Sequence, residues 1–262
     1  MDKEDDSYLA PEFLALAHRG GSLLPSNLGI ENTLAAFNNA AELGFRYLET
    51  DVHATSDGHL AAFHDADLSR VTDVPGRISQ FTLAQLSTVR VGGREQIPTL
   101  DDLLEAFPDA RFNLDIKADA ATDLLVDAVK RHRAAHRVCV GSFAISRIHR
   151  FRRELPGVTT AASPFGAAGL AWGRWLLAAS AGDVFQVPMQ HQVAGVTTRL
   201  VTPRSVSAVH RSGRKIHVWT IDRPEVMHEL IDWGVDGIVT DRPDLLRDVL
   251  QARGMWSTHI GT

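Results

Sequence analysis

The chain alternates short stretches of β-forming residues with stretches of helical periodicity, and this alternation constrains the fold more than any other feature. We expect strands at residues 13–17, 45–52, 111–117, 138–143, 158–163, 184–189, 215–221 and 236–240. Helical patterns follow most of these strands, for example at residues 33–43, 121–132, 145–155, 203–211, 224–233 and 243–252. Alternating units of strand and helix pack as a parallel sheet covered by helices, and eight such units close into a barrel. The pattern therefore predicts an α/β fold, the (β/α)8 TIM barrel.

The length of 262 residues suits either one such barrel or two smaller domains. No linker rich in Pro, Gly or Ser and no low-complexity segment divides the sequence, so we expect residues 1–262 to form a single domain. The alternation breaks once, where residues of about 53–98 separate the second strand from a helical pattern at 99–107. Long loops inside a domain usually carry function. This small insertion after strand 2 follows the carboxyl end of a strand, the face where barrel active sites are built.

Charge and cysteine content exclude several classes of protein. The chain carries 27 basic and 32 acidic residues and has no basic run, so nucleic acid is not an expected partner. The single Cys139 excludes an internal disulfide framework and fits a reducing compartment. The first residues, MDKEDDSY, are acidic and polar, whereas a secretory signal begins basic and continues apolar. We therefore expect a cytoplasmic protein.

The longest apolar stretch spans residues 164–180. Four interruptions, three of them glycines and one Arg174, leave it short of the ~20 apolar residues that a membrane crossing needs. Trp172 and Trp175 leave two alternatives open, a helix packed on the sheet or peripheral contact with a membrane surface. No transmembrane segment is expected.

Carboxylates recur at a spacing of two on the expected strands. Glu49 and Asp51 point to the same side of the second strand, where two like charges need a proton, a cation or a metal to compensate them. Asp115 and Lys117 repeat this spacing on the next strand. The three carboxylates form an all-oxygen set that suits Mg²⁺ or Ca²⁺ better than zinc. The alternative is a pair of structural ion pairs, Arg19 with Glu49 and Lys117 with Asp51.

Two imidazoles accompany these charges. His18 and Arg19 end the first strand, so two groups that can be cationic stand there without a counter-charge beside them in sequence. Because the carboxyl ends of parallel strands meet at one face of a barrel, we expect their counter-charges from the second and third strands. His64, in the insertion, supplies the second imidazole, although a histidine taken alone is more often solvated or packed than catalytic.

Six motifs together resemble the glycerophosphodiester phosphodiesterase family. They are HRG at 18–20, ENT at 31–33, ETDVHATSDGHLAAFHD at 49–65, LDIK at 114–117, VWTID at 218–222 and GIVTDRP at 237–243. The resemblance covers nearly the whole chain in order and implies a barrel with a small insertion after its second strand. It also implies hydrolysis of a small-molecule glycerophosphodiester to sn-glycerol-3-phosphate and an alcohol, through a cyclic phosphate formed by the substrate's own vicinal hydroxyl.

The resemblance assigns roles by motif position. It implies a divalent metal on Glu49, Asp51 and Asp115, an acid/base pair in His18 and His64, and a phosphate held by Arg19 and Lys117. The sequence departs from the family pattern in two places. Asp115 stands where the family commonly has Glu, and residues 21–30 form a longer link before Glu31 than is usual. Two roles are therefore open for Glu31, which either orients Arg19 or begins the helix that follows.

The remaining candidates concern substrate size and helix starts. Phe143, Phe185 and Trp219 fall near expected strand ends and belong either to the core or to an apolar wall of the mouth. In the second case a lysophospholipid becomes an alternative substrate, and a barrel that binds phosphodiesters without turnover is a further alternative. Asp222 and Asp241 each precede a proline at a helix start, so we expect them to be helix N-caps.

Overall fold

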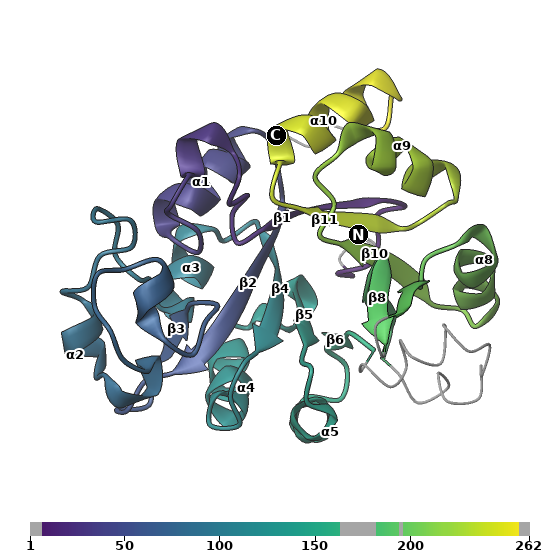
Figure 1. The fold of residues 1–262 in the computed structure, drawn as a ribbon. Coiled ribbons are helices and arrows are strands. Elements are labelled where there is room, and N and C mark those ends of the chain that lie inside the picture. The colour runs from purple at the N-terminus through teal and green to yellow at the C-terminus, as the bar shows by residue number, and fades with distance from the viewer. Residues whose placement is uncertain (1–6, 163–181, 194–195, 257–262) are drawn as a thin grey trace.

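The structure is a computed structural model that describes residues 7–162, 182–193 and 196–256. Its centre is a curved parallel sheet with the strand order β6-β5-β4-β2-β1-β11-β10-β7 (Figure 1). The strands of this sheet are β1 (Leu14–His18), β2 (Tyr47–Ala54), β4 (Arg111–Ile116), β5 (Val138–Gly141), β6 (Thr159–Thr160), β7 (Val184–Pro188), β10 (Lys215–Trp219) and β11 (Gly237–Thr240). Each overlaps one of the expected strands, and the (β/α)8 TIM barrel is confirmed.

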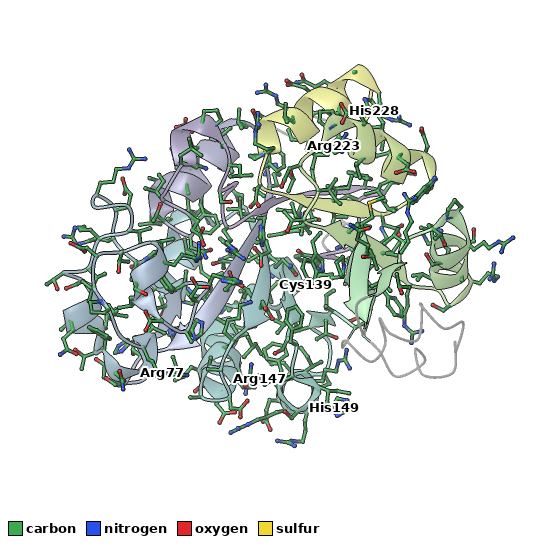
Figure 2. All side chains as sticks on the ribbon, in the orientation of Figure 1. Arg77, Cys139, Arg147, His149, Arg223 and His228 are labelled. Carbon is green, nitrogen blue, oxygen red and sulfur yellow. The ribbon has the colours of Figure 1, made fainter. Side chains whose placement is uncertain are left out.

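Helices surround the sheet (Figure 1). They are α1 (Leu34–Glu42), α3 (Leu100–Ala106), α4 (Ala121–Arg131), α5 (Ile145–Glu154), α8 (Pro203–Arg211), α9 (Pro224–Asp232) and α10 (Pro243–Ala252). Side chains that alternate along each strand divide the core in two. One set, which includes Leu48, Phe112 and Phe185, packs between sheet and helices, and the other, which includes Leu16 and Cys139, fills the barrel interior. In Figure 2 the side chain of Cys139 lies at the centre of the molecule.

The segment before β1 plugs the amino-terminal end of the barrel. Tyr8 is buried, with its ring centroid 5.1 Å from that of Tyr47, whose hydroxyl donates to the Tyr8 carbonyl at 2.7 Å. The Lys215 ammonium donates to the carbonyls of Leu9 and Pro11 at 2.8 and 2.7 Å. Tyr47 and Lys215 are the first residues of β2 and β10, so the plug lies at the end of the barrel opposite the carboxyl ends of the strands.

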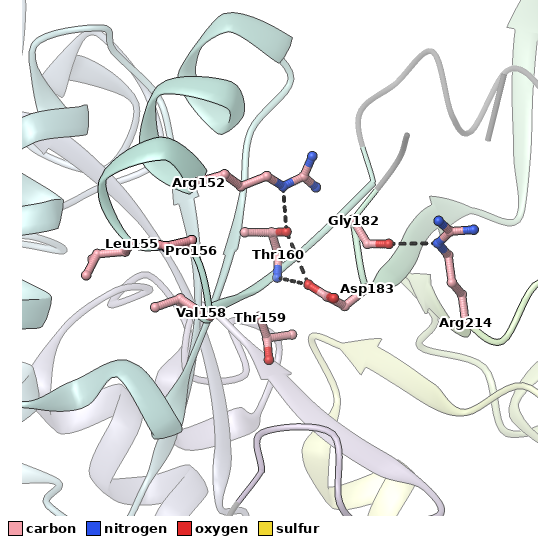
Figure 3. A pocket seen from close by; sticks show the side chains of 10 residues that line it. Arg152, Leu155, Pro156, Val158, Thr159, Thr160, Gly182, Asp183 and Arg214 are labelled. Atoms are coloured by element: carbon pink, nitrogen blue, oxygen red, sulfur yellow. Dashed lines mark hydrogen bonds between the residues drawn. The ribbon is translucent and has the colours of Figure 1, made fainter. Parts of the chain in front are cut away.

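The barrel closes between β6 and β7 by a short seam (Figure 3). Only a single bridge, between Ala161 and Val184, joins these two strands in the described residues. Asp183 reinforces the seam, because its carboxylate accepts from the backbone N–H and the hydroxyl of Thr160 at 2.8 and 3.2 Å. A pocket of about 460 Å³ lies beside the seam, and Arg152 and Arg214 are among its lining residues. Hydrogen bonds from Arg152 to Thr160 and from Arg214 to the carbonyl of Gly182 give both arginines a structural role.

The interruption after β2 builds a small unit of its own. Strand β3 (Leu60–Ala62) pairs antiparallel with the end of β2, and helix α2 (Leu83–Leu86) follows. The unit has a separate apolar cluster that includes Phe63, Leu68, Ile78, Leu86 and Val91. A second addition is the hairpin of β8 (Gln190–Val193) and β9 (Val196–Arg199), which follows β7. Both additions follow the carboxyl end of a barrel strand.

Asp222 and Asp241 do not cap the helices that follow them. The N-cap prediction for Asp222 and Asp241 is wrong, because Arg223 and Arg242 are the N-cap residues of α9 and α10, and neither makes a side-chain cap hydrogen bond in the described structure. The expected apolar stretch at 164–180, with Trp172 and Trp175, lies outside the described residues. Among the helices that the structure describes, none has the length and apolar character of a membrane span.

Candidate active site

His18 ends β1 and lies between two carboxylates. Its Nδ1 atom is 2.8 Å from Asp241 Oδ1, and its Nε2 atom is 3.7 Å from Glu49 Oε2. Ser22 donates its hydroxyl to the same oxygen of Asp241 at 2.7 Å. Burial opposes the charged imidazole, but the charge of Glu49 and the hydrogen bond to Asp241 outweigh it and raise the pKa of His18 above its ordinary value. Asp241, expected as a helix cap, thus orients an imidazole at the carboxyl end of the barrel.

Glu49 and Asp51 lie on one face of β2, as their spacing predicts, and both are buried. Burial and the neighbouring charge of Asp51 raise the pKa of Glu49 to about 7. Burial would also raise the pKa of Asp51, but the charges of Lys117 and Arg19 hold it below its ordinary value. Cationic side chains therefore compensate only part of the negative charge of Glu49 and Asp51.

Lys117 joins the next strand to this pair. Its Nζ atom is 2.9 Å from Asp51 Oδ1 and 2.7 Å from Asp115 Oδ2, and Asp51 and Asp115 are direct neighbours in the register of β2 and β4. The ion pair expected between Lys117 and Asp51 is present. The Arg19 side chain pairs instead with Glu31 and Asp51, at 3.0 and 3.5 Å, while its backbone N–H donates to Glu49 Oε2 at 3.2 Å.

His64 follows β3 and reaches the same region. Its Nδ1 atom is 2.7 Å from Asp65 Oδ1. The charge of His64, like the charges of Lys117 and Arg19, lowers the pKa of Asp51. His53 is buried on β2, and its Nε2 atom lies 3.1 Å from the carbonyl oxygen of His64. The His64 side chain is 32% exposed, so it is neither packed in the core nor fully solvated.

Glu31 orients Arg19, which settles the two roles open for it. Its Oε1 atom accepts from Arg19 Nη1 at 3.0 Å, whereas α1 begins after Thr33, whose hydroxyl accepts from Ala36. Sequence reasoning missed Arg70, which donates to both oxygens of Glu31 at 2.6 and 2.9 Å and also bonds Asp65. It also missed Asp65 as a partner of His64, although the two are adjacent. No sequence pattern points to Arg70, because 39 positions separate it from Glu31.

The aromatic candidates divide between mouth and core. Phe143 follows β5 and is 65% exposed, and its ring lies 6.1 Å from that of Trp219 at an interplanar angle of 81°. Lys117 Nζ is 5.8 Å from the centroid of the Phe143 ring. Phe143 and Trp219 therefore stand beside the charged cluster, whereas Phe185 is buried between the sheet and the helices.

The carboxylates fit a divalent cation by donor chemistry. Glu49, Asp51 and Asp115 offer only oxygen atoms, which hard cations prefer, and the raised pKa of Glu49 marks a buried acidic pair that another positive charge would stabilise. In this structure Lys117 Nζ stands between Asp51 and Asp115. Among the described residues, no three His, Cys, Asp or Glu side chains are arranged to enclose an ion. An ion held by all three carboxylates would therefore require Lys117 to move.

The hydroxyl of Thr50 and the thiol of Cys139 are poor nucleophiles. Thr50 is buried and donates its hydroxyl to Asn32 Oδ1 at 2.8 Å. Burial raises the pKa of Cys139 far above its ordinary value, so its thiol stays protonated. The hydroxyl of Ser22 is bonded to Asp241, and the candidate reactive groups at this face are the acids, bases and cations described above. A barrel with such groups at the carboxyl ends of its strands defines an enzyme suited to an anionic substrate.

The family model for the glycerophosphoryl diester phosphodiesterase family matches residues 18–245, and the chain belongs to this family. It is 41% identical over 253 residues to a probable glycerophosphodiester phosphodiesterase 2 of Mycobacterium tuberculosis, covering 93% of this chain and 92% of that protein. It is 31% identical over 257 residues to a glycerophosphodiester phosphodiesterase of Caldanaerobacter subterraneus, covering 92% and 99%. The fold is similar to an Oleispira antarctica phosphodiesterase solved with the product sn-glycerol-3-phosphate, with a TM-score of 0.74, 23% identity and coverage of 91% and 96%.

Proposed function

We propose that this protein hydrolyses glycerophosphodiesters to sn-glycerol-3-phosphate and an alcohol by acid/base catalysis. The observation that carries the proposal is the pair of imidazoles, His18 and His64, each bonded through Nδ1 to a carboxylate at the same face of the barrel. Such a bond sets the ring's orientation and directs Nε2 to proton transfer. A barrel that only binds phosphodiesters would need cations but no such pair. The names of the two relatives above agree with this activity.

The reaction that we propose begins with attack by the glycerol hydroxyl beside the ester. One imidazole takes the proton of this hydroxyl as its oxygen bonds to phosphorus, and the other protonates the departing alcohol oxygen as its bond to phosphorus breaks. Water then opens the cyclic phosphate to sn-glycerol-3-phosphate. A hydroxyl already held beside phosphorus avoids the entropic cost of capturing a free water. Arg19 and Lys117 neutralise the charge that grows on the phosphoryl oxygens.

We infer that Glu49, Asp51 and Asp115 hold a divalent cation, Mg²⁺ or Ca²⁺, during turnover. When bound, such an ion supplies positive charge that stabilises the phosphoryl oxygens in the transition state. Support comes from the all-oxygen donor set and from the raised pKa of Glu49, which a cation would lower again. Asp115 is one methylene shorter than the Glu usual at this place, and a water molecule can fill the difference.

A second candidate substrate class is the lysophospholipids. The supporting observation is Phe143, whose ring is 65% exposed beside Trp219 and Lys117, where an acyl chain entering with the phosphodiester would meet it. Both substrate classes present the same phosphodiester to the same cations.

The test is the release of sn-glycerol-3-phosphate from glycerophosphocholine by chain purified with and without a chelator. We expect turnover that the chelator abolishes and that Mg²⁺ or Ca²⁺ restores. His18→Ala and His64→Ala should each lower kcat by at least ~10²-fold while the chain stays folded. Full activity after removal of metal would refute the metal assignment. A faster reaction with lysophosphatidylcholine than with glycerophosphocholine would favour the second substrate class.

A further inference from the structure

Five side chains form a continuous chain of contacts between His64 and Arg19. In order they are His64, Asp65, Arg70, Glu31 and Arg19. His64 Nδ1 is 2.7 Å from Asp65 Oδ1, and the other oxygen of Asp65 accepts from Arg70 Nε. Arg70 Nη1 and Nη2 donate to the two oxygens of Glu31 at 2.9 and 2.6 Å, and Arg19 Nη1 donates to Glu31 at 3.0 Å. From His64 to Arg19, the two carboxylates thus alternate with one imidazole and two guanidinium groups.

We propose that Arg70 is a positioning residue, which holds His64 through Asp65 and Arg19 through Glu31 in a fixed relation to each other. The inference rests on the proposed function, in which His64 transfers a proton and Arg19 binds the phosphate. Arg70 itself bonds neither reacting group. It belongs to the insertion, at the end of the 3-10 helix Leu68–Arg70, and links the insertion to the loop that precedes α1.

The shape of the guanidinium group suits this role. Its Nε atom serves one carboxylate while its two Nη atoms serve the other, so a single planar group fixes both. Lysine has one compact ammonium and cannot reproduce this fork. Burial alone would raise the pKa of Glu31, but the hydrogen bond from Arg70 and the charge of Arg19 hold it below its ordinary value. Without Arg70, two carboxylates would stand close together with one cation fewer between them.

A role in stability alone does not account for these contacts. The Arg70 side chain is 45% exposed, and exposed ion pairs contribute little to the free energy of unfolding. The loop and the insertion also meet without it, because Gly92 packs so closely on Gly29 that a Cβ atom on Gly92 would lie 2.5 Å from the Gly29 carbonyl oxygen. The insertion should therefore stay in place when Arg70 is replaced, and the loss should appear in catalysis.

The test compares Arg70→Ala and Arg70→Lys with a matched control, Arg150→Ala. Arg150 is 46% exposed and pairs with Asp123 on α4, away from the site. We expect Arg70→Ala to lower kcat for glycerophosphocholine by about 10- to 100-fold, the scale of a small misplacement of a catalytic group. Arg70→Lys should stay below the native rate, methylguanidinium should restore part of the kcat of Arg70→Ala, and all melting temperatures should stay close to that of the native chain. Arg150→Ala should keep the native kcat.

A second readout does not depend on activity. In chain labelled with ¹⁵N-histidine, the ring signals of His64 should shift or broaden in Arg70→Ala and stay unchanged in Arg150→Ala. If the native chain does not hydrolyse glycerophosphocholine, the proposed function fails, and the ring signals still decide whether Arg70 positions His64. Unchanged His64 signals together with a kcat within twofold of native would overturn the inference. A fall in kcat that is fully explained by a lowered melting temperature would also overturn it, because Arg70 would then contribute to stability and not to the positioning of His64.

Discussion

At the scale of single residues, the sequence reveals the carboxylate partner of His64 more readily than the carboxylate partner of His18. Asp65 is adjacent to His64, whereas Asp241 is 223 positions from His18 and reaches it only because β1 and β11 pair in the closed barrel. Asp241 precedes a helix that begins with proline, which suggested an N-cap. Proline already fixes the backbone angle of the first helical residue and donates no N–H, so α10 forms without a side-chain cap.

Replacement of Asp241 separates these two roles. In Asp241→Asn the amide binds the neutral imidazole but cannot stabilise its protonated form, so we expect kcat for glycerophosphocholine to fall by about 10²-fold. Because Asp241 does not cap α10, the free energy of unfolding should change by much less than the ~1 kcal/mol that loss of a cap costs. Asp244→Asn, in the first turn of the same helix, is the control and should keep its kcat. The reverse pattern, lost stability with normal kcat, would restore the N-cap interpretation.

At the scale of secondary-structure elements, the apolar periodicity of the sequence predicted the strands and helices of the barrel. The strands and helices of the barrel appear within a few residues of their expected bounds, because each is set by its own alternation of apolar and polar residues. The plug at residues 7–12 has no periodicity and could not be predicted. The plug reaches its place through contacts of Tyr8 with Tyr47 and of Leu9 with Lys215, partners that are distant in sequence. The Arg70 contacts are of the same kind, since they depend on how the insertion folds back on the loop before α1.

Tyr8 offers a matched pair of substitutions for the plug. Tyr8→Ala should lower the free energy of unfolding by about 3–5 kcal/mol, the usual cost of deleting a buried aromatic ring. Tyr8→Phe should be neutral or stabilising, because the buried Tyr8 hydroxyl has no hydrogen-bond partner among the described residues. Urea unfolding measures both. Equal losses for the two variants would mean that the hydroxyl, and not the ring, secures the plug.

At the scale of the whole molecule, the barrel keeps polar groups in its interior beneath the site. Gln186 donates to Asn113 at 3.0 Å and lies 3.5 Å from His217 Nδ1. His217 is fully buried, and burial together with the charge of Lys215 lowers its pKa to about 3. The folded barrel therefore holds this imidazole neutral, whereas the unfolded chain protonates it near its ordinary pKa.

This difference predicts a loss of stability in acid. Because the pKa of His217 is depressed in the folded state, its contribution is present above pH ~6.5 and is lost as the pH falls toward the folded value. Between pH 7 and pH 5 the native chain should lose about 2 kcal/mol of unfolding free energy through this group alone. His217→Gln, which does not titrate, should show a pH dependence smaller by that amount in urea unfolding. Parallel pH profiles for the two proteins would contradict the buried neutral state.

The central claim is that two oriented imidazoles let the substrate's own hydroxyl attack phosphorus. Phosphorus NMR of the native chain with glycerophosphocholine, and with its analogue lacking the 2-hydroxyl, tests this most directly. We predict a cyclic glycerol phosphate signal that appears before sn-glycerol-3-phosphate, and very slow turnover of the deoxy analogue even though it binds. Comparable kcat on both substrates, with no cyclic phosphate, would contradict the claim and leave direct attack by water.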